Sequence, residues 1–392
     1  MVVSHPPSRT ELARRASDLV PLLQKNALWT EDNRRLPAET IDALADAGLM
    51  RMRIPARYGG YESKMSTVVD VVSELARGDG STSWTVAVWA ISSWMVGLFP
   101  DDVQDEVFAD PDVRISGILS PRAVAIPAAG GVILNGRWSF NTGAQQSQWN
   151  TNAAVLSTAS GEEPIMTVIP LVDLEIIDDW YAAGLRGTGS VTTVARDLFV
   201  PDQRVLPMGP VIQGVHRSTA NAGSSIYQGP FMPTVCATVS ATALGLAKAA
   251  RDAFFERLPG RKITYTEDAD HSQAPLTHLQ VGEATVKIDE AEFHAYRAAR
   301  MVDDKGQDGR PWTLEERAQS RLDMSAVCQC AKEAVDILSS ATGASSVYSH
   351  VPMQRIERDA RALNLIALMH PDTNLELYGR ILCGLPPNTS YV

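Results

Sequence analysis

The spacing of apolar residues changes twice along this chain of 392 residues, and these changes constrain its fold more than any other feature. Apolar residues keep helical spacing up to about residue 112, alternate with polar residues up to about residue 206, and return to helical spacing after Tyr227. A period of 3.6 is typical of a helix with one buried face, and a period of two is typical of a strand. The pattern predicts an α+β chain with regions 1–112, 113–212 and 213–392.

Segments with a clear helical pattern fill the first region. One begins at Leu36-Pro37 and ends near Gly48, a residue type common at helix C-termini. Two more are predicted over Met65–Ala76 and Ser83–Leu98. The Gly59-Gly60 pair predicts a loop between the first and second helix.

The middle region has the alternation of a sheet. Val132, Leu134, Trp138 and Phe140 fall on one side of a predicted strand, with polar residues between them. Further strands are predicted over Ala153–Leu156, Ile165–Leu171 and Thr192–Val200.

Composition excludes several classes of function. The net charge of −11 is spread along the chain, which argues against nucleic-acid and anionic membrane surfaces. No apolar run has the length of a membrane span, and the first residues lack the apolar core of a signal peptide. The four cysteines lack metal-ligand spacing, so we expect reduced core thiols, no metal site and a cytoplasmic protein.

A glycine-rich turn precedes the last predicted strand of the middle region. Gly184, Gly187 and Gly189 surround Thr188 and Ser190. Glycines let a backbone approach a flat or charged ligand closely, and small hydroxyls supply adaptable hydrogen bonds. The turn is therefore a candidate ligand site, and the alternative is an ordinary turn between strands.

Five runs in this order resemble the acyl-CoA dehydrogenase superfamily, and more closely its oxygen-using branch, the group D two-component flavin-dependent monooxygenases. The runs are Leu36–Gly60, Ala76–Trp84, Gly136–Gly143 (GRWSFNTG), Gly184–Ser190 (GLRGTGS) and Met353–Ala362 (MQRIERDARA). The resemblance covers nearly the whole chain. It implies an N-terminal helical domain, a middle β-barrel-like domain and a C-terminal four-helix bundle, with a flavin at their junction and a homotetrameric assembly.

The resemblance also implies which residues surround the flavin. Facing the reactive edge of the isoalloxazine ring it places Ser120, as a catalytic hydroxyl. Along the ring it places Phe140, Asn141, Thr142 and Gly143. Around the neighbouring part of the cavity it places Arg186, Thr188, Gly189 and Ser190. Against flavin phosphate or ribose, sometimes from a second subunit, it places Arg261, Gly343 and Ser345. Without the resemblance, satisfied strand hydroxyls are the better explanation of Ser120 and Thr142.

The two branches of the superfamily need different catalytic groups. A dehydrogenase needs a carboxylate base shortly after the Arg-Asp-Ala run, and the residues in register here are Ile366, Ala367 and Leu368, which cannot accept a proton. A relocated base on an earlier helix would be Glu283 or Glu290, and both are also explained as solvated carboxylates on a helix face.

A hydroxylating oxygenase protects a C4a-hydroperoxyflavin in a dry cavity, and many members of that branch use a histidine in the C-terminal segment. The nearest histidine is His370, one helical turn past Ile366. If the helix continues, the two residues share a face, so His370 is our catalytic candidate. Pro371 biases it away from helical geometry, and the alternative is a histidine that bonds a carbonyl at a helix end.

The helix predicted over Ser83–Leu98 lines the substrate side of the flavin in the family. Trp89, Ser93 and Trp94 are the candidate substrate-pocket residues, because aromatic walls stack on flat substrates. Tryptophans at this spacing are also the normal contents of a core, and without other support that alternative is the better one.

These observations predict the oxygenase component of a two-component monooxygenase that hydroxylates a small, aromatic metabolite with O₂. Reduced flavin, FADH2 or FMNH2, would come from a separate reductase, because the chain has no glycine-rich dinucleotide-binding turn. The alternatives are an acyl-CoA dehydrogenase with a relocated base, an N-oxygenating member of the same branch, and a flavin- or metabolite-binding protein without catalysis.

Overall fold

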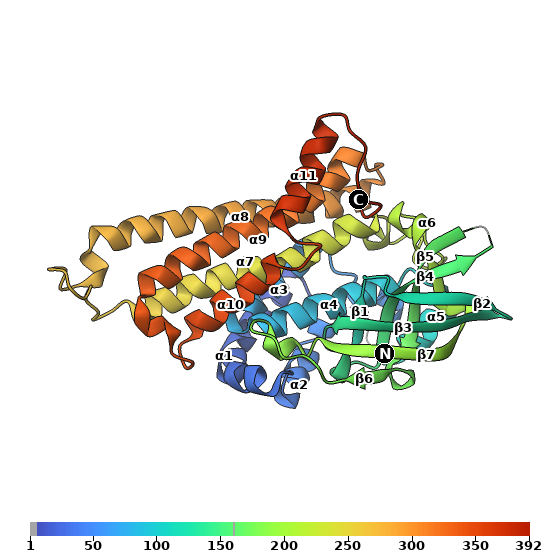
Figure 1. Cartoon of the computed structure of the whole chain (residues 1–392), viewed down its shortest axis with the longest axis horizontal. Helices are drawn as coiled ribbons and strands as arrows, with labels where there is room; N and C mark the ends of the chain where they lie inside the picture. Colours follow the sequence, from blue (N-terminus) through green and yellow to red (C-terminus); the bar gives the residue numbers. More distant parts are fainter. Residues whose placement is uncertain (1–5, 160) are drawn as a thin grey trace.

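The computed structural model describes residues 6–159 and 161–392, and it has the three parts that the periodicity predicts. Figure 1 shows the N-terminal helices beside a twisted sheet, with a bundle of helices running along both. Helix α4 (Gly80–Val96) lies where the three parts meet. It packs against helix α7 (Phe231–Arg257) of the bundle and strand β1 (Ile115–Ile118) of the sheet. The α+β architecture of helices, sheet and bundle is therefore confirmed.

The N-terminal part contains five α-helices among the described residues: α1 (Arg9–Asn33), α2 (Ala38–Asp46), α3 (Met65–Gly78), α4 and α5 (Asp101–Val107). Asp79 separates α3 from α4, because its extended backbone ends α3 and its carboxylate accepts a hydrogen bond from the Thr82 N–H at 2.8 Å. Gly48 follows α2 with φ of 72°, and a Cβ there would lie 2.3 Å from Tyr61 Oη. Only glycine fits at this position after the end of α2.

The middle part is a sheet with the strand order β6-β7-β3-β2-β4-β5-β8, and β1 pairs with β4. Its strands are β1 (Ile115–Ile118), β2 (Ala123–Ala128), β3 (Gly131–Asn141), β4 (Trp149–Thr158), β5 (Gly161–Pro170), β6 (Glu175–Ile177), β7 (Val191–Pro201) and β8 (Val205–Pro207). The strands predicted within β4, β5 and β7 are confirmed. The long antiparallel ladder of β3 with β7 carries the two glycine-containing runs to the same end of the sheet.

The alternation predicted for β3 fails at its end. The register of β3 against β7 shifts between Trp138 and Asn141, and Phe140 has a left-handed backbone with φ of 67°. A bulge of this kind reverses the sides to which the following side chains point. Phe140 is 60% exposed, whereas Asn141 is buried, so the prediction that Phe140 shares the inner face of Trp138 is wrong.

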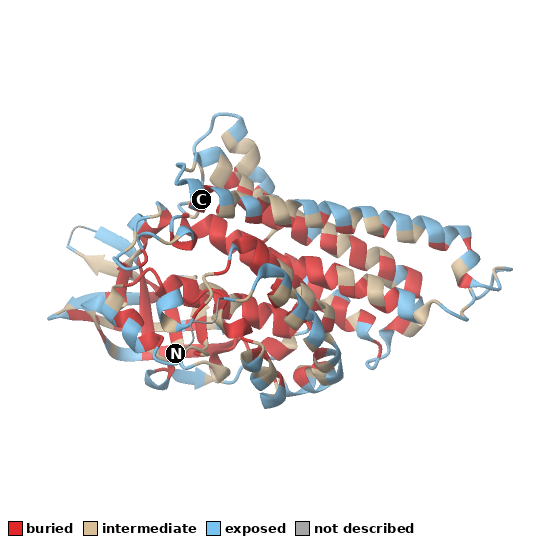
Figure 2. Cartoon of the chain, turned by 180° about the vertical axis from the view of Figure 1, so that it is seen from behind, coloured by how far each residue is buried: buried red, intermediate tan, exposed pale blue. Residues whose placement is uncertain are grey.

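The C-terminal part is a helical bundle reached through the short helix α6 (Met208–Ile212). Its helices are α7 (Phe231–Arg257), α8 (Pro275–Asp308), α9 (Leu314–Thr342), α10 (Pro352–Asn364) and α11 (Pro371–Leu382). Figure 2 shows α7 as buried and the outer face of α8 as exposed. Small residues on α7 allow close packing: a Cβ at Gly245 would lie 2.2 Å from Ser73 O of α3. Cys383 is exposed, so the expectation of a core thiol is wrong at that position.

Candidate active site

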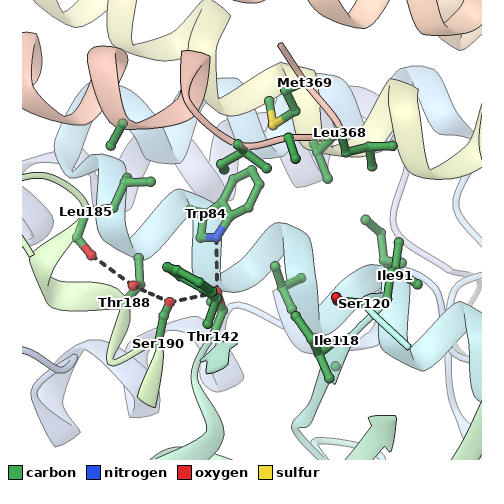
Figure 3. Close-up of a pocket in the computed structure, with 18 of the residues that line it drawn as sticks. Trp84, Ile91, Ile118, Ser120, Thr142, Leu185, Thr188, Ser190, Leu368 and Met369 are labelled. Atoms are coloured by element: carbon green, nitrogen blue, oxygen red, sulfur yellow. Dashed lines mark hydrogen bonds between the residues drawn. The ribbon is translucent and has the colours of Figure 1, made fainter. Parts of the chain in front are cut away.

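A cavity of about 860 Å³ lies between the sheet, α4 and the C-terminal part of the chain. Figure 3 shows the side chains on its wall. Most of them are apolar, and they come from α4, from the end of β1 and from the segment after α10: Trp84, Ile91, Met95, Ile118, Leu368 and Met369. A largely apolar cavity of this volume with a few convergent polar groups is typical of a small-molecule site.

One part of the polar wall is a continuous chain of hydrogen bonds (Figure 3). Trp84 Nε1 donates to Thr142 Oγ1 at 3.1 Å, and Thr142 Oγ1 lies 2.8 Å from Ser190 Oγ. Ser190 Oγ lies 2.7 Å from Thr188 Oγ1, which donates to the Leu185 carbonyl oxygen at 2.8 Å. The three hydroxyl residues are almost fully buried.

The donors and acceptors in this row of hydrogen bonds follow one direction, because each hydroxyl carries a single hydrogen. The Leu185 carbonyl can only accept, so the Thr188 hydrogen points to it, and Thr188 Oγ1 must accept from Ser190. Ser190 then accepts from Thr142, whose hydrogen is likewise committed. The hydroxyl hydrogens of Thr142, Ser190 and Thr188 are therefore all used within this row, and each of the three oxygens keeps one lone pair. The wall therefore offers acceptors to a ligand.

Five of the residues predicted to contact a flavin or to act in catalysis lie on this wall: Ser120, Phe140, Thr142, Thr188 and Ser190. Ser120 follows β1 by two residues instead of lying within a strand. The backbone N–H of Gly143 donates to the Thr188 carbonyl at 2.9 Å, which joins the two glycine-containing runs. The sequence could not show this pairing, because 45 residues separate the two positions.

Four predicted residues of the same runs lie outside the wall. Asn141 is buried and donates to Asn150 and Thr193, so it supports the sheet. Gly143 and Gly189 have left-handed backbones and shape the two turns. The Arg186 side chain is not on the cavity wall.

The structure places a different face of α4 on the cavity than the sequence predicted. Trp84, Val88, Ile91, Ser92 and Met95 line it.

Trp89, Ser93 and Trp94 do not line the cavity, so that prediction is wrong. Trp94 is fully buried, donates to the Ile226 carbonyl at 2.7 Å and stacks on Phe231. Trp89 donates to Ser147 at 3.0 Å on another side of the helix. Both faces of α4 are buried, so apolar spacing could not identify the one that faces the cavity.

His370 is also not on the cavity wall. Helix α10 ends at Asn364, so Ile366 and His370 do not share a helical face, and the argument from helical spacing is wrong. Ile366 lines the cavity, whereas His370 is the N-cap of α11 and precedes Pro371. The His370 carbonyl accepts hydrogen bonds from Thr373 and Asn374. The residue therefore shapes a helix start.

Arg261 and Ser345 lie together at the far end of the bundle from the sheet. Arg261 donates to the Thr342 carbonyl at 3.0 Å and to Ser345 Oγ at 3.2 Å. Arg257, which the sequence analysis missed, also donates to Ser345 Oγ, at 3.1 Å. Gly343, with φ of 77°, makes the turn that places Ser345 there. None of these residues lines the cavity of the same chain.

A buried pair of carboxylates behind the glycine-rich loop was also missed. Burial and the charge of Asp79 together raise the pKa of Asp359 to about 7. Burial also raises the pKa of Asp79, while Arg355 opposes both shifts. The signal in the sequence is the Arg-Asp-Ala run, which by itself indicates only the family resemblance.

Comparison with known proteins places this site in a family. The acyl-CoA dehydrogenase N-terminal domain matches residues 14–110, and the acyl-CoA dehydrogenase C-terminal domain matches residues 237–371. The chain is 30% identical over 384 residues to a pigment production hydroxylase of Rhodococcus sp., covering 97% of this chain and 98% of that protein.

Two further similarities show which branch of the superfamily the chain belongs to. The chain is 30% identical over 386 residues to the oxygenase subunit HsaA of a flavin-dependent monooxygenase from Mycobacterium tuberculosis, covering 96% of each. Its fold matches XiaF from Streptomyces sp., solved in complex with FADH2 and glycerol, with a TM-score of 0.90, 28% identity and 98% of each chain covered. The chain belongs to the acyl-CoA dehydrogenase superfamily, in its branch of oxygenase components of flavin-dependent monooxygenases.

Proposed function

We propose that this protein is the oxygenase component of a two-component monooxygenase that uses reduced flavin and O₂ to hydroxylate a small aromatic metabolite. The observation that carries the proposal is the one-directional row of hydroxyls on the wall of a largely apolar cavity. A reduced isoalloxazine ring carries N–H groups that the oxidised ring lacks. Acceptors on the wall therefore favour the reduced ring.

The residues on the wall fit a flavin ring. Phe140 is exposed towards the cavity and meets Trp180 edge to face, with 5.8 Å between ring centroids, so the two rings offer an aromatic surface. Thr142 and Ser190 would accept hydrogen bonds from the ring, and Ser120 would lie near its reacting edge. When bound, reduced flavin supplies the electrons that activate O₂. The apolar side chains of α4 and residues 365–369 would exclude water from the ring.

The same cavity supports an aromatic substrate. Trp84, Ile91 and Met95 of α4 and Leu368 and Met369 offer it a flat apolar space. The relatives of this chain include a resorcinol hydroxylase and a p-hydroxyphenylacetate 3-hydroxylase, which supports hydroxylation of an aromatic ring. Oxygen transfer to nitrogen is the alternative within the branch, and product analysis distinguishes the two.

The acyl-CoA dehydrogenase alternative loses its proposed bases. Glu283 and Glu290 are exposed on α8, and neither lines the cavity. Glu290 accepts a hydrogen bond from Lys287 at 3.1 Å, as a surface carboxylate does. Anaerobic addition of an acyl-CoA to the flavin-loaded protein tests this alternative, and we expect no reduction of the flavin.

A homotetramer in the cytoplasm, served by a diffusing flavin reductase, completes the proposal. Four apolar side chains form an exposed stripe along α8, each more than half exposed: Leu276, Leu279, Val286 and Phe293. They recur at helical spacing, so they share one face, which a second copy of the chain would cover. The Arg261 and Ser345 cluster would then reach a flavin phosphate or ribose of a neighbouring subunit. Light scattering of the wild type and of Leu279→Glu tests this assembly.

Anaerobic titration with reduced and oxidised flavin tests the proposal at the site. We expect FADH2 or FMNH2 to bind more tightly than its oxidised form, because only the reduced ring satisfies the additional acceptors. Equal affinity for both forms would contradict the assignment of the hydroxyl chain to the flavin.

A further inference from the structure

Asp359 of α10 holds the glycine-rich loop that forms one wall of the cavity. Its Oδ1 accepts a hydrogen bond from the Leu185 N–H at 2.6 Å, and Asp359 is almost fully buried. Leu185 has a left-handed backbone, with φ of 52° and ψ of 34°. A leucine adopts this conformation only where its surroundings enforce it. The Asp359 carboxyl group is the side chain that binds the Leu185 N–H.

The loop is pressed closely against α10. A Cβ at Gly184 would lie 2.2 Å from the Arg358 carbonyl oxygen, so only glycine permits this approach. Arg358 Nη1 also donates to the Ala183 carbonyl. Residues 183–185 are therefore fixed to α10 by two hydrogen bonds and one backbone contact.

The backbone of Leu185 connects this anchor to the cavity wall, because its N–H binds Asp359 and its carbonyl group lies on the other side of its Cα atom. Its carbonyl oxygen accepts from Thr188 Oγ1 at 2.8 Å and from Trp180 Nε1 at 3.1 Å. The Thr188 bond sets the direction of the hydroxyl chain through Ser190 to Thr142. A change in the position of Leu185 would therefore change which hydrogens and lone pairs face the cavity.

The charged groups around Asp359 come from three elements. Asp79 lies at the junction of α3 and α4, Arg355 and Arg358 lie on α10, and Glu31 of α1 pairs with Arg358 at 2.7 Å. Burial and the Asp79 charge raise the pKa of Asp359 to about 7. The group thus changes charge near neutral pH, and a carboxylate accepts a hydrogen bond more strongly than a neutral acid does.

We propose that Asp359 is a positioning residue: its ionised carboxyl group holds the Leu185 peptide so that Thr188, Ser190 and Thr142 present acceptors to the ligand. The consequence for flavin rests on the proposed function, because the loop that Asp359 holds is the wall assigned to that group. The effect on the loop itself does not depend on any ligand.

Hydrogen exchange of peptides that contain Leu185 tests the positioning role without activity. In the wild type, protection of the Leu185 amide, corrected for the intrinsic exchange rate, should fall about five- to tenfold as the pH is lowered through about 7. Asp359→Asn keeps the shape but not the charge. It should show the low protection at every pH, with the rest of the protein unchanged.

Asp79→Asn is the matched control, because Asp79 is the other buried carboxylate but caps α4 through Thr82. This variant should keep full protection of Leu185 above neutral pH. It should lower the pH at which protection falls, because a like charge near Asp359 is removed. If Asp359→Asn does not fold, the wild type and Asp79→Asn carry the test. Protection of Leu185 that is independent of pH, or that is the same in Asp359→Asn and wild type, would overturn the proposal.

Anaerobic binding of reduced flavin above neutral pH separates this inference from the proposed function. Asp359→Asn should weaken binding about fivefold, and Asp79→Asn should change it less than about twofold. A wild type that binds no reduced flavin contradicts the proposed function while the exchange experiment still tests the loop. A wild type that binds, with Asp359→Asn binding equally well, overturns the positioning role.

Discussion

Removal of the hydroxyl in the middle of the hydrogen-bonded row, with Ser190→Ala, should weaken the preference that we expect the site to have for reduced flavin. Ser190 donates to Thr188 and accepts from Thr142, and it is 5% exposed. Its loss leaves the Thr142 hydrogen without its acceptor. An unsatisfied buried polar group costs about 1–3 kcal/mol, so the protein should lose about this much stability.

The change at the ligand has a definite sign. The released Thr142 hydrogen can turn into the cavity, where it donates to an acceptor of the oxidised ring and opposes an N–H of the reduced ring. One hydrogen bond contributes about 1 kcal/mol, so the affinity for reduced flavin should fall about fivefold. The affinity for oxidised flavin should stay the same or rise.

Ser83→Ala is the matched control. Ser83 is fully buried on the same helix as Trp84, donates to the Val72 carbonyl at 2.7 Å and bonds Thr242 at 3.0 Å. It does not line the cavity, so its removal should destabilise the protein similarly and leave both flavin affinities unchanged. Anaerobic fluorescence titration measures the affinities. An unchanged ratio of reduced to oxidised affinity in Ser190→Ala would refute the reasoning.

Three further predictions concern Asp359, the two catalytic candidates His370 and Ser120, and Gly143. Asp359 binds a proton more tightly in the folded protein than in the unfolded chain, because folding raises its pKa from 3.8 to about 7. At low pH this proton therefore adds up to about 4 kcal/mol to the free energy of unfolding. The contribution is lost as the pH rises between these two pKa values. Thermal unfolding should show Asp359→Asn to be less sensitive to pH than wild type. His370→Ala should leave the hydroxylation rate unchanged, whereas Ser120→Ala should lower it, as measured by product formation with a reductase present. Gly143→Ala should lower the melting temperature, because φ is 68° and a Cβ would lie 2.7 Å from Trp89 Nε1.

Apolar periodicity predicts the elements of this fold well, because a single buried face leaves a simple pattern. The strand predicted over Thr192–Val200 lies within β7, and the helix predicted over Met65–Ala76 lies within α3. Periodicity fails where the backbone departs from regular geometry. A shift of register places Phe140 on the opposite side from the one predicted, and the end of α10 at Asn364 separates Ile366 from His370.

The candidate site was predicted in part, for a related reason. Thr142, Thr188 and Ser190 were placed at the flavin by resemblance, but the direction of their hydrogen bonds needed coordinates. Trp94 was misplaced because both faces of α4 are buried. Asp359 was overlooked because its partner, Leu185, is 174 residues away and contributes only a backbone N–H. Contacts between side chains and distant backbone groups leave no pattern in a sequence.

The most direct test of the central claim is the reaction of the bound reduced flavin with O₂. The protein is mixed anaerobically with FADH2 or FMNH2, oxygenated buffer is added in a stopped-flow instrument, and absorbance is recorded. Our account predicts a transient absorbance band that differs from reduced and oxidised flavin, and reoxidation slower than that of free flavin. Reoxidation at the rate of free flavin, without such a band, would contradict the assignment as an oxygenase component.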